Sequence, residues 1–174
     1  MGQPSLILAV EDVLLQGRAL LDAVDTAVYT WKDEKGCGAS IGMHYRHVLE
    51  HFQCLIEGIQ SGRVDYDHRK RSFELENSLD AAFLATDGLI DTFRSLSAEA
   101  MQGECTVTYS VGYGEHGPEE VRSTLAREVA FCVGHATHHY AILKPLCAQL
   151  AVKLPYEFGI APSTLKHLHT QEAH

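Results

Sequence analysis

The sequence predicts an all-α protein, an up-down four-helix bundle with a small β-hairpin before its last long helix. Four segments place apolar residues at steps of three, four and seven, which is the period of an amphipathic helix. Between the third and fourth segments, a short stretch alternates apolar and polar residues, as a half-buried strand does. The chain has 174 residues, of which 45% are hydrophobic, and is expected to form a single domain over residues 1–174.

The first helix is predicted over residues 6–30, with Ser5 as its N-cap. Its apolar positions follow the helical period, and they are Leu6, Val10, Val13, Leu14, Leu20, Leu21, Val24 and Val28. Residues 32–40 combine charge with glycine and are expected to form a loop.

The second helix is predicted over residues 40–60 and the third over residues 78–96, each with one apolar face. On the second helix this face consists of Ile41, Val48, Phe52, Leu55 and Ile59. On the third it consists of Leu79, Phe83, Leu89, Ile90 and Phe93. The polar residues 61–72 between the two helices are expected to be a connection.

A strand is predicted around residues 107–111, and it returns as a hairpin through residues 120–122 after a turn rich in glycine. Ser123 is expected to cap the fourth helix, which runs to Leu150. Pro145 is expected to kink or weaken the last two turns of that helix. The tail is expected to be a loop, in which Ser163 caps a short final helical turn.

The composition narrows the classes of partner. The formal net charge is -9, and residues 68–71 form the only basic run, so nucleic acid is not an expected partner. No apolar stretch approaches the roughly 20 residues of a membrane span. The N-terminus shows no basic region followed by an apolar core, so a cytoplasmic location is expected.

The five cysteines are odd in number, and no two have the spacing of a thiolate metal site. They are Cys37, Cys54, Cys105, Cys132 and Cys147. We expect reduced and mostly buried thiols, because free cysteine packs as a small hydrophobic residue.

Three of the eleven histidines fall within five consecutive positions of the predicted fourth helix. At about 100° per residue, His135 and His139 lie at or within the apolar arc, whereas His138 falls toward the polar side. Two imidazoles one turn apart on a buried face can bind one metal ion together. Further ligands must then come from a facing helix.

The second helix offers His44, His47 and His51, all at the near edge of its apolar arc. The periodicity indicates that this helix supplies a ligand, but it does not choose among the three. The alternative to a metal ligand is, for each of them, a buried histidine that is hydrogen-bonded within the core. The presence of histidines at the core edge of two helices favours the metal site over this alternative.

The stretches SIGMHYRHVLEH and GHATHHYAIL resemble the DinB-like (YfiT-like) superfamily of four-helix-bundle metalloproteins. YDHRKR, STLARE and FGIAPST resemble a bacterial subgroup of it, and the resemblance covers most of the chain from Ser40 onward. The first helix matches only in type. The resemblance implies that the second-helix ligand, seven residues after Ser40, is His47, and that the H-x-x-x-H pair is His135 and His139.

Three imidazoles without a thiolate suit Zn²⁺ or Ni²⁺, and Fe²⁺ is a further candidate. A site with three protein ligands keeps one coordination position open, as catalytic metal sites do. The motif is not H-E-x-x-H, because Ala136 stands where a zinc peptidase has its glutamate.

Other polar residues are candidates for supporting roles. Glu128 and His51 are expected to hold the ligand histidines by hydrogen bonds, although Glu128 suits a salt bridge near the helix start equally well. Arg69 and Arg71 are candidates for binding a substrate carboxylate, against the alternative of a solvated charge run.

Two classes of function follow. The first is a metal-dependent enzyme, for which the resemblance implies a small substrate and either S-transfer on low-molecular-weight thiols or hydrolysis. The second is a metal-binding protein of stress response or sensing that catalyses nothing. The resemblance also implies a homodimer, which sedimentation at tens of micromolar protein tests.

Overall fold

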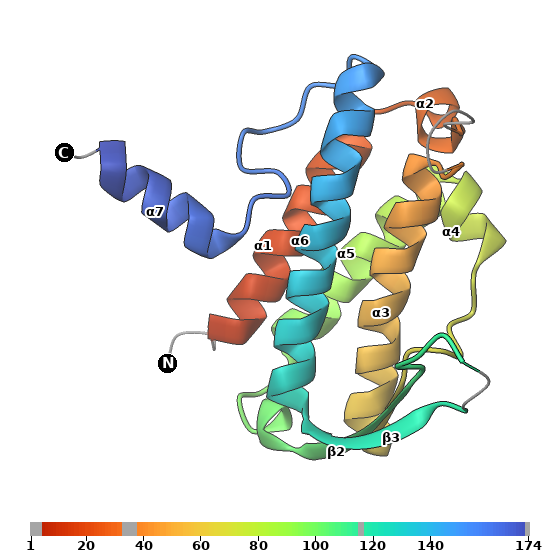
Figure 1. Cartoon of the computed structure of the whole chain (residues 1–174), viewed down its shortest axis with the longest axis vertical. Helices are drawn as coiled ribbons and strands as arrows, with labels where there is room; N and C mark the ends of the chain where they lie inside the picture. Colours follow the sequence, from red (N-terminus) through yellow and green to blue (C-terminus); the bar gives the residue numbers. More distant parts are fainter. Residues whose placement is uncertain (1–4, 33–37, 115–116, 173–174) are drawn as a thin grey trace.

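The computed structural model describes residues 5–32, 38–114 and 117–172 (Figure 1). Its four long helices are α1 (Ser5–Asp22), α3 (Ile41–Ser61), α5 (Leu79–Ser95) and α6 (Leu125–Gln149). They form the predicted four-helix bundle, in which α1 and α3 each pack against both α5 and α6. Within the described ranges, no helix is both long enough and apolar enough to cross a membrane.

The directions of the helices depart from the expected simple up-down order. Tyr45 bonds to Thr86, and Phe52 packs on Phe93 one heptad further along both helices, so α3 and α5 run parallel. In contrast, α3 and α6 are antiparallel, because His44 meets His139 and His47 meets His135. The connection between α3 and α5 therefore has to travel back along the bundle (Figure 1).

This connection contains structure that its polar composition did not predict. It includes the strand β1 (Arg63–Asp65) near the end of α3 and the short helix α4 (Phe73–Asn77) at the start of α5. The return segment between them, residues 66–72, is fastened to α3. The buried Glu50 accepts a hydrogen bond from the backbone N–H of Ser72 at 2.7 Å, and Glu57 forms an ion pair with Lys70 at 3.3 Å.

A small sheet closes the end of the bundle where α3 ends and α6 begins (Figure 1). The predicted hairpin is present as β2 (Glu104–Tyr109) and β3 (Glu119–Thr124), which are antiparallel. β1 adds to β2 in parallel, so the strand order is β1-β2-β3. A 3₁₀ turn, η1 (Ala100–Gln102), leads into β2.

Several predicted helix boundaries were wrong. The first predicted helix is two helices, because the chain turns after Asp22 and α2 (Thr26–Thr30) begins again with Asp25 as its N-cap. Ser5 is already the first helical residue of α1. The N-cap of α6 is Thr124, whose hydroxyl accepts a hydrogen bond from the backbone N–H of Arg127, and not Ser123.

The C-terminal part is more helical than expected. α6 continues through Pro145 to Gln149. The predicted short turn is the helix α7 (Pro162–Glu172), in which Ser163 lies inside the helix and does not cap it. α7 stands apart from the four long helices in Figure 1.

Candidate metal centre

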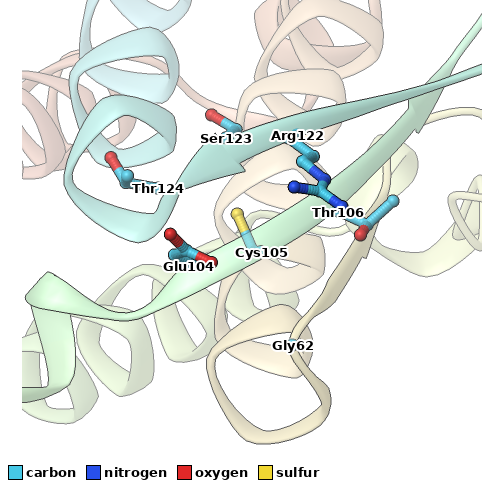
Figure 2. A pocket seen from close by; sticks show the side chains of 7 residues that line it. All are labelled: Gly62, Glu104, Cys105, Thr106, Arg122, Ser123 and Thr124. Atoms are coloured by element: carbon cyan, nitrogen blue, oxygen red, sulfur yellow. The ribbon is translucent and has the colours of Figure 1, made fainter.

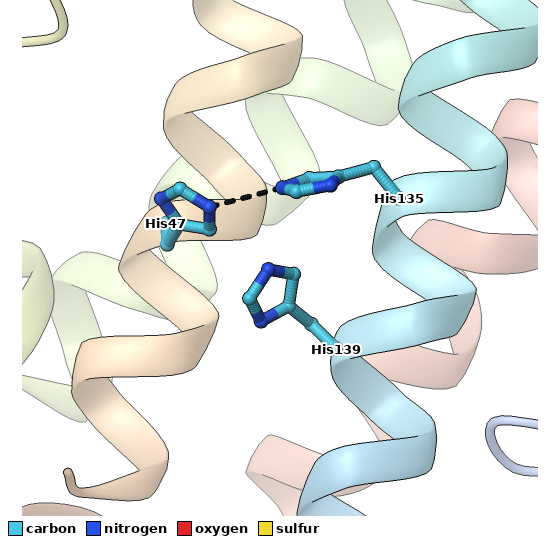
Figure 3. A group of neighbouring side chains, drawn as sticks. All are labelled: His47, His135 and His139. Atoms are coloured by element: carbon cyan, nitrogen blue, oxygen red, sulfur yellow. Dashed lines mark hydrogen bonds between the residues drawn. The ribbon is translucent and has the colours of Figure 1, made fainter. Parts of the chain in front are cut away.

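Three histidines from two helices converge at the contact between α3 and α6 (Figure 3). One ring nitrogen each of His47, His135 and His139 lies within 4.8 Å of the other two. The Nε2 atoms of His47 and His135 are 2.9 Å apart, and the ring of His139 is 4.6 Å from each of the other two rings. The structure thus brings together the three residues that the sequence and the family resemblance proposed as ligands.

The core packing of the two helices places these side chains. Val48 on α3 and Ala136 and Tyr140 on α6 are fully buried, and each is the neighbour of a ligand candidate in the chain. The histidines are therefore held at the edge of the core, half-buried, where they face both the partner helix and the surface. His138 is exposed and outside the cluster, as the helical phase predicted.

Burial keeps the three imidazoles neutral, which is the state that binds a metal ion. Loss of solvent is the main cause that lowers the pKa of His47 to about 2, of His135 to about 4 and of His139 to about 3. The neighbouring histidines add to the shift, because each would repel a second positive charge in the cluster.

His51 lies beside the cluster, and its tautomer is fixed by the helix backbone. Its Nδ1 is 2.7 Å from the carbonyl oxygen of His47, which can only accept, so Nδ1 carries the proton and Nε2 is an acceptor. The ring of His51 is 4.4 Å from that of His47 and 4.2 Å from that of His135. Burial is the main cause that lowers its pKa to about 4. His51 therefore packs against two ligand candidates as a neutral ring.

His44 occupies the opposite side of the cluster. Its Nδ1 is 3.0 Å from Nδ1 of His139, so one of these two rings donates a hydrogen bond to the other. The bond leaves Nε2 of His139 free for the cluster. Nε2 of His44 is buried and has no hydrogen-bond partner among the described residues. The sequence offered His44 only as one of three ligand candidates, and the structure gives it a supporting contact.

Glu128 is buried near the start of α6, but its contacts differ from those expected. It accepts hydrogen bonds from the hydroxyls of Tyr66 at 3.0 Å and Ser123 at 2.5 Å, and within the described ranges it bonds to no histidine. The ring of Tyr66 stacks on that of His51 at 5.2 Å. Burial raises the pKa of Tyr66 far above its ordinary value, so the phenol stays protonated and donates to Glu128. Glu128 thus reaches the cluster only through Tyr66 and His51.

The structure separates the two arginines proposed for substrate binding. Arg69 is partly buried, donates to the carbonyl oxygen of Tyr66 and lines a cavity of about 230 Å³ together with His51 and Phe131. Arg71 is exposed, lies outside that cavity and has a left-handed backbone with φ 50°. Only Arg69 is placed to act near the histidines.

Two further cavities open directly on the cluster. One, of about 420 Å³, is lined by Phe131 and His135, and the other, of about 250 Å³, is lined by His44, His47 and His139. A larger cavity of about 530 Å³ lies at the sheet, lined by residues that include Cys105 and Arg122 (Figure 2). Burial raises the pKa of the Cys105 thiol, which favours the protonated thiol over the thiolate. The described residues that line this cavity include no histidine.

The cysteines of the described ranges are free, and three of the four are buried, as expected. Burial raises the pKa of Cys132 to about 12 and of Cys147 and Cys54 to about 11. Cys37 lies outside the described residues. The described cysteines are therefore thiols, and the cluster consists of imidazoles alone.

Sequence reasoning did not identify Tyr66 and Phe131, the aromatic residues beside the cluster. Phe131 stacks on His135 at 5.6 Å and lies 5.2 Å from Tyr66. The position of Phe131, one turn before His135 on α6, is a signal that was available, because residues four apart share one helix face. Tyr66 follows a three-residue strand that has no detectable period of its own.

Comparisons with known proteins agree with this architecture. A model of the DinB superfamily matches residues 16–143. The chain is similar to FK506-binding protein 5 of Rhizopus delemar, with 31% identity over 108 residues, which are 62% of this chain and 28% of that protein. The chain thus spans little more than a quarter of the length of that relative.

Among solved structures, the chain is similar to a DinB-like protein of Bacillus subtilis, YjoA, with a TM-score of 0.65. The two share 15% identity, and the match covers 89% of this chain and 99% of the other, which shows a common fold. The family model covers most of the chain and includes all three histidines of the cluster, and the chain therefore belongs to the DinB superfamily.

Proposed function

We propose that this protein is a metal-dependent enzyme that acts on a small substrate, by S-transfer on a low-molecular-weight thiol or by hydrolysis, and that it works as a cytoplasmic homodimer. The observation that carries the enzymatic part is the cluster of three neutral imidazoles beside two cavities. Among the residues that the structure describes, the cluster offers three candidate ligands, which leaves a position for a substrate atom.

The donor set fits a divalent metal ion. His47, His135 and His139 would hold it, and three nitrogen donors without thiolate or carboxylate favour Zn²⁺ or Ni²⁺, with Fe²⁺ as a further candidate. When bound, the ion supplies Lewis acidity, which lowers the pKa of a coordinated thiol or water.

The chain's own residues supply the remaining functions. His51 presents Nε2 as a proton acceptor, because its Nδ1 proton is held by the carbonyl oxygen of His47. Phe131 and Tyr66 stack on His135 and His51, and so provide apolar surface for a substrate beside the cluster. Ala136 is fully buried, so the second position of the H-x-x-x-H pair contributes packing and no proton transfer.

The test is turnover with defined metal content. Purified protein is stripped, reloaded with Zn²⁺ or Ni²⁺, and incubated with glutathione or cysteine and the electrophile monochlorobimane, and thiol consumption is followed. We expect the loaded protein to consume thiol faster than the uncatalysed reaction does. Metal-free protein and His47→Ala should not exceed the uncatalysed rate. His138→Ala, an exposed neighbour, is the matched control and should keep the activity.

A screen of esters and amides with the same samples covers the hydrolytic alternative. Stoichiometric metal with no turnover in either screen would contradict the enzymatic proposal and favour a metal-binding role in sensing or stress response. The absence of bound metal would exclude both.

A further inference from the structure

The cavity that Arg69 lines, here called the arginine cavity, combines aromatic walls with two cations. Its volume is about 230 Å³, below the roughly 300–1,000 Å³ that is typical of sites for drug-sized ligands. The rings of Tyr66, Phe131 and His51 form one side of it, and the side chains of Arg69 and Arg127 also line it. The space suits a small organic molecule with an apolar body.

Neither arginine of this cavity is neutralised by a close carboxylate. Among the described residues, four of the eight arginines form ion pairs within 4.0 Å, and they are Arg18, Arg46, Arg63 and Arg94. The other four form none, and they are Arg69, Arg71, Arg122 and Arg127. Of the four unpaired arginines, Arg69 and Arg127 line the arginine cavity, and Arg71 and Arg122 do not.

Arg69 also carries a buried donor at the cavity. Its Nε is buried and has no hydrogen-bond partner within the part of the chain that the structure describes. A buried donor without a partner destabilises the protein, and an acceptor on a ligand would remove that cost.

The two carboxylates that line the same cavity are already engaged. Glu128 accepts from Tyr66 and Ser123, and Asp67 accepts from the hydroxyl of Ser110 at 2.8 Å. The four charged groups of the wall sum to zero before a ligand enters. A ligand with one carboxylate can pair with the two arginines, because the carboxylates of the wall are held by hydroxyl groups and lie beyond 4.0 Å from either guanidinium.

The arginine cavity adjoins the metal centre. His51, in its wall, packs on His135 at 4.2 Å, and Phe131 lies between the arginine cavity and the open cavity at His135 and lines both. The guanidinium of Arg127 lies 5.8 Å from the ring of Phe131 and also lines both spaces. A molecule lying along Phe131 can thus place one end at the histidines and the other at the arginines.

We infer that the arginine cavity binds the carboxylate end of the substrate, with Arg69 and Arg127 pairing with the carboxylate and Phe131 contacting the apolar body. This inference rests on the proposed function, because it assigns the substrate a reactive end at the histidines. It narrows the substrate class to small monocarboxylates with an apolar or aromatic part.

Binding of benzoate to metal-free protein tests the cavity separately from the metal. Benzamide, which has the same ring and no charge, is the matched ligand, and affinities are measured by ligand-observed NMR titration. We expect benzoate to bind and benzamide to bind at least tenfold more weakly. Arg69→Gln and Arg127→Gln should each weaken benzoate binding by about tenfold, since each removes one charge-assisted contact.

Arg71→Gln is the control variant, because it removes a charge from the same basic run outside the cavity. It should leave benzoate affinity unchanged. Arg127 is exposed and forms no hydrogen bond through its side chain among the described residues, so Arg127→Gln keeps the test valid even if Arg69→Gln does not fold.

Equal binding of benzoate and benzamide, or equal losses in Arg71→Gln and Arg127→Gln, would overturn the inference. Zinc stoichiometry and thiol turnover are measured on the same samples. If benzoate binds as expected but zinc does not, the proposed function fails while the arginine cavity stands. If zinc binds and thiol is turned over but benzoate does not bind, the proposed function stands and the inference about the cavity fails.

Discussion

His138 and His139 are neighbours in the chain, yet the structure gives them opposite roles. His138 is exposed, while His139 is half-buried and has His44, His47 and His135 around its ring. One helical step of about 100° is enough to move an imidazole from solvent into the cluster. Metal binding should therefore depend sharply on which histidine is removed.

Alanine substitutions provide the first prediction. His47→Ala, His135→Ala and His139→Ala should each abolish stoichiometric zinc retention after dialysis, because two imidazoles hold zinc far less tightly than three. His138→Ala should retain one zinc per chain. His44→Ala should retain the site but weaken it by roughly 10- to 100-fold, as is usual when a hydrogen bond to a ligand histidine is removed.

The measurement is metal content by elemental analysis together with competition against a chromogenic chelator. If His138→Ala loses zinc while His139→Ala keeps it, the assignment of the cluster is wrong. If His44→Ala behaves like His47→Ala, then His44 is a ligand rather than a supporting residue.

The residues of the cluster were only partly predictable from sequence. The helical phase of α6 identified His135 and His139, because each lies at the edge of a long apolar arc. The phase of α3 could not choose among His44, His47 and His51, since all three lie at one edge of its arc. That choice depends on how far α3 is shifted along α6, which is set by contacts with other elements.

At the scale of elements, α3 is held in place by a close approach near its N-terminus. Gly42 lies in the first turn of α3, and a Cβ atom there would come within 2.1 Å of the carbonyl oxygen of Glu76 and 2.8 Å of the ring of Tyr29. The hydroxyl of Tyr29 donates to the carbonyl oxygen of Leu75 at 2.7 Å. The start of α3 is thus packed tightly against α2 and α4.

Gly42→Ala should accordingly destabilise the fold and disturb the site. The added methyl group would force α3 away from α4, at a cost of about 1–3 kcal/mol in the free energy of unfolding, which is typical of overpacking. Zinc affinity should fall as well, because His44 and His47 lie within the next turn and a half of the same helix.

Gly88→Ala is the matched control, because it lies in α5 with open space around its Cβ position. Helix propensity predicts that it stabilises the fold by up to about 1 kcal/mol. Urea unfolding of both variants measures the effect. Equal stability of Gly42→Ala and the wild type would contradict the close packing of α3 on α4.

Elements long enough to repeat their apolar pattern several times were predictable from the sequence, and short elements were not. The four long helices repeat their apolar residues over four or more turns, which a sequence pattern detects. β1 has three residues and α4 has five, too few for a period to appear. The break between α1 and α2 was hidden because Val24 and Val28 continue the apolar spacing across the turn.

For the whole molecule, the buried histidines make stability depend on pH. Burial lowers the pKa of His44, His47, His51, His135 and His139 below the ordinary value of about 6.5. Between that value and the lowered ones, the unfolded chain binds protons that the folded chain does not. The free energy of unfolding is therefore greatest above pH 6.5 and falls as the pH drops below it.

We predict that metal-free protein, kept in chelator, loses stability steadily from pH 7 to pH 5. The midpoint of urea unfolding measures this loss. His51→Phe, which removes one buried imidazole and keeps a ring of similar shape, should show a shallower dependence. His138→Gln, an exposed control, should follow the wild type, and a midpoint that does not change between pH 7 and pH 5 would refute the prediction.

The overall arrangement also shows a limit of sequence periodicity. Amphipathic patterns established that four helices pack together, but they carry no information about direction. The parallel pairing of α3 with α5 follows from the return segment 66–72, whose polar residues indicated only a connection.

The return segment has a consequence for how the protein can diversify. The three histidines of the cluster lie on two helices, α3 and α6, whose mutual shift is fixed by the core. Five of the nine residues that line the arginine cavity come from the return segment and β2, and three of these five, Asp67, Arg69 and Tyr109, lie outside the buried core. Substitutions at these three positions leave the packing of the helices intact. Under the proposed function, one scaffold could therefore keep its chemistry while related proteins differ in the compounds on which they act.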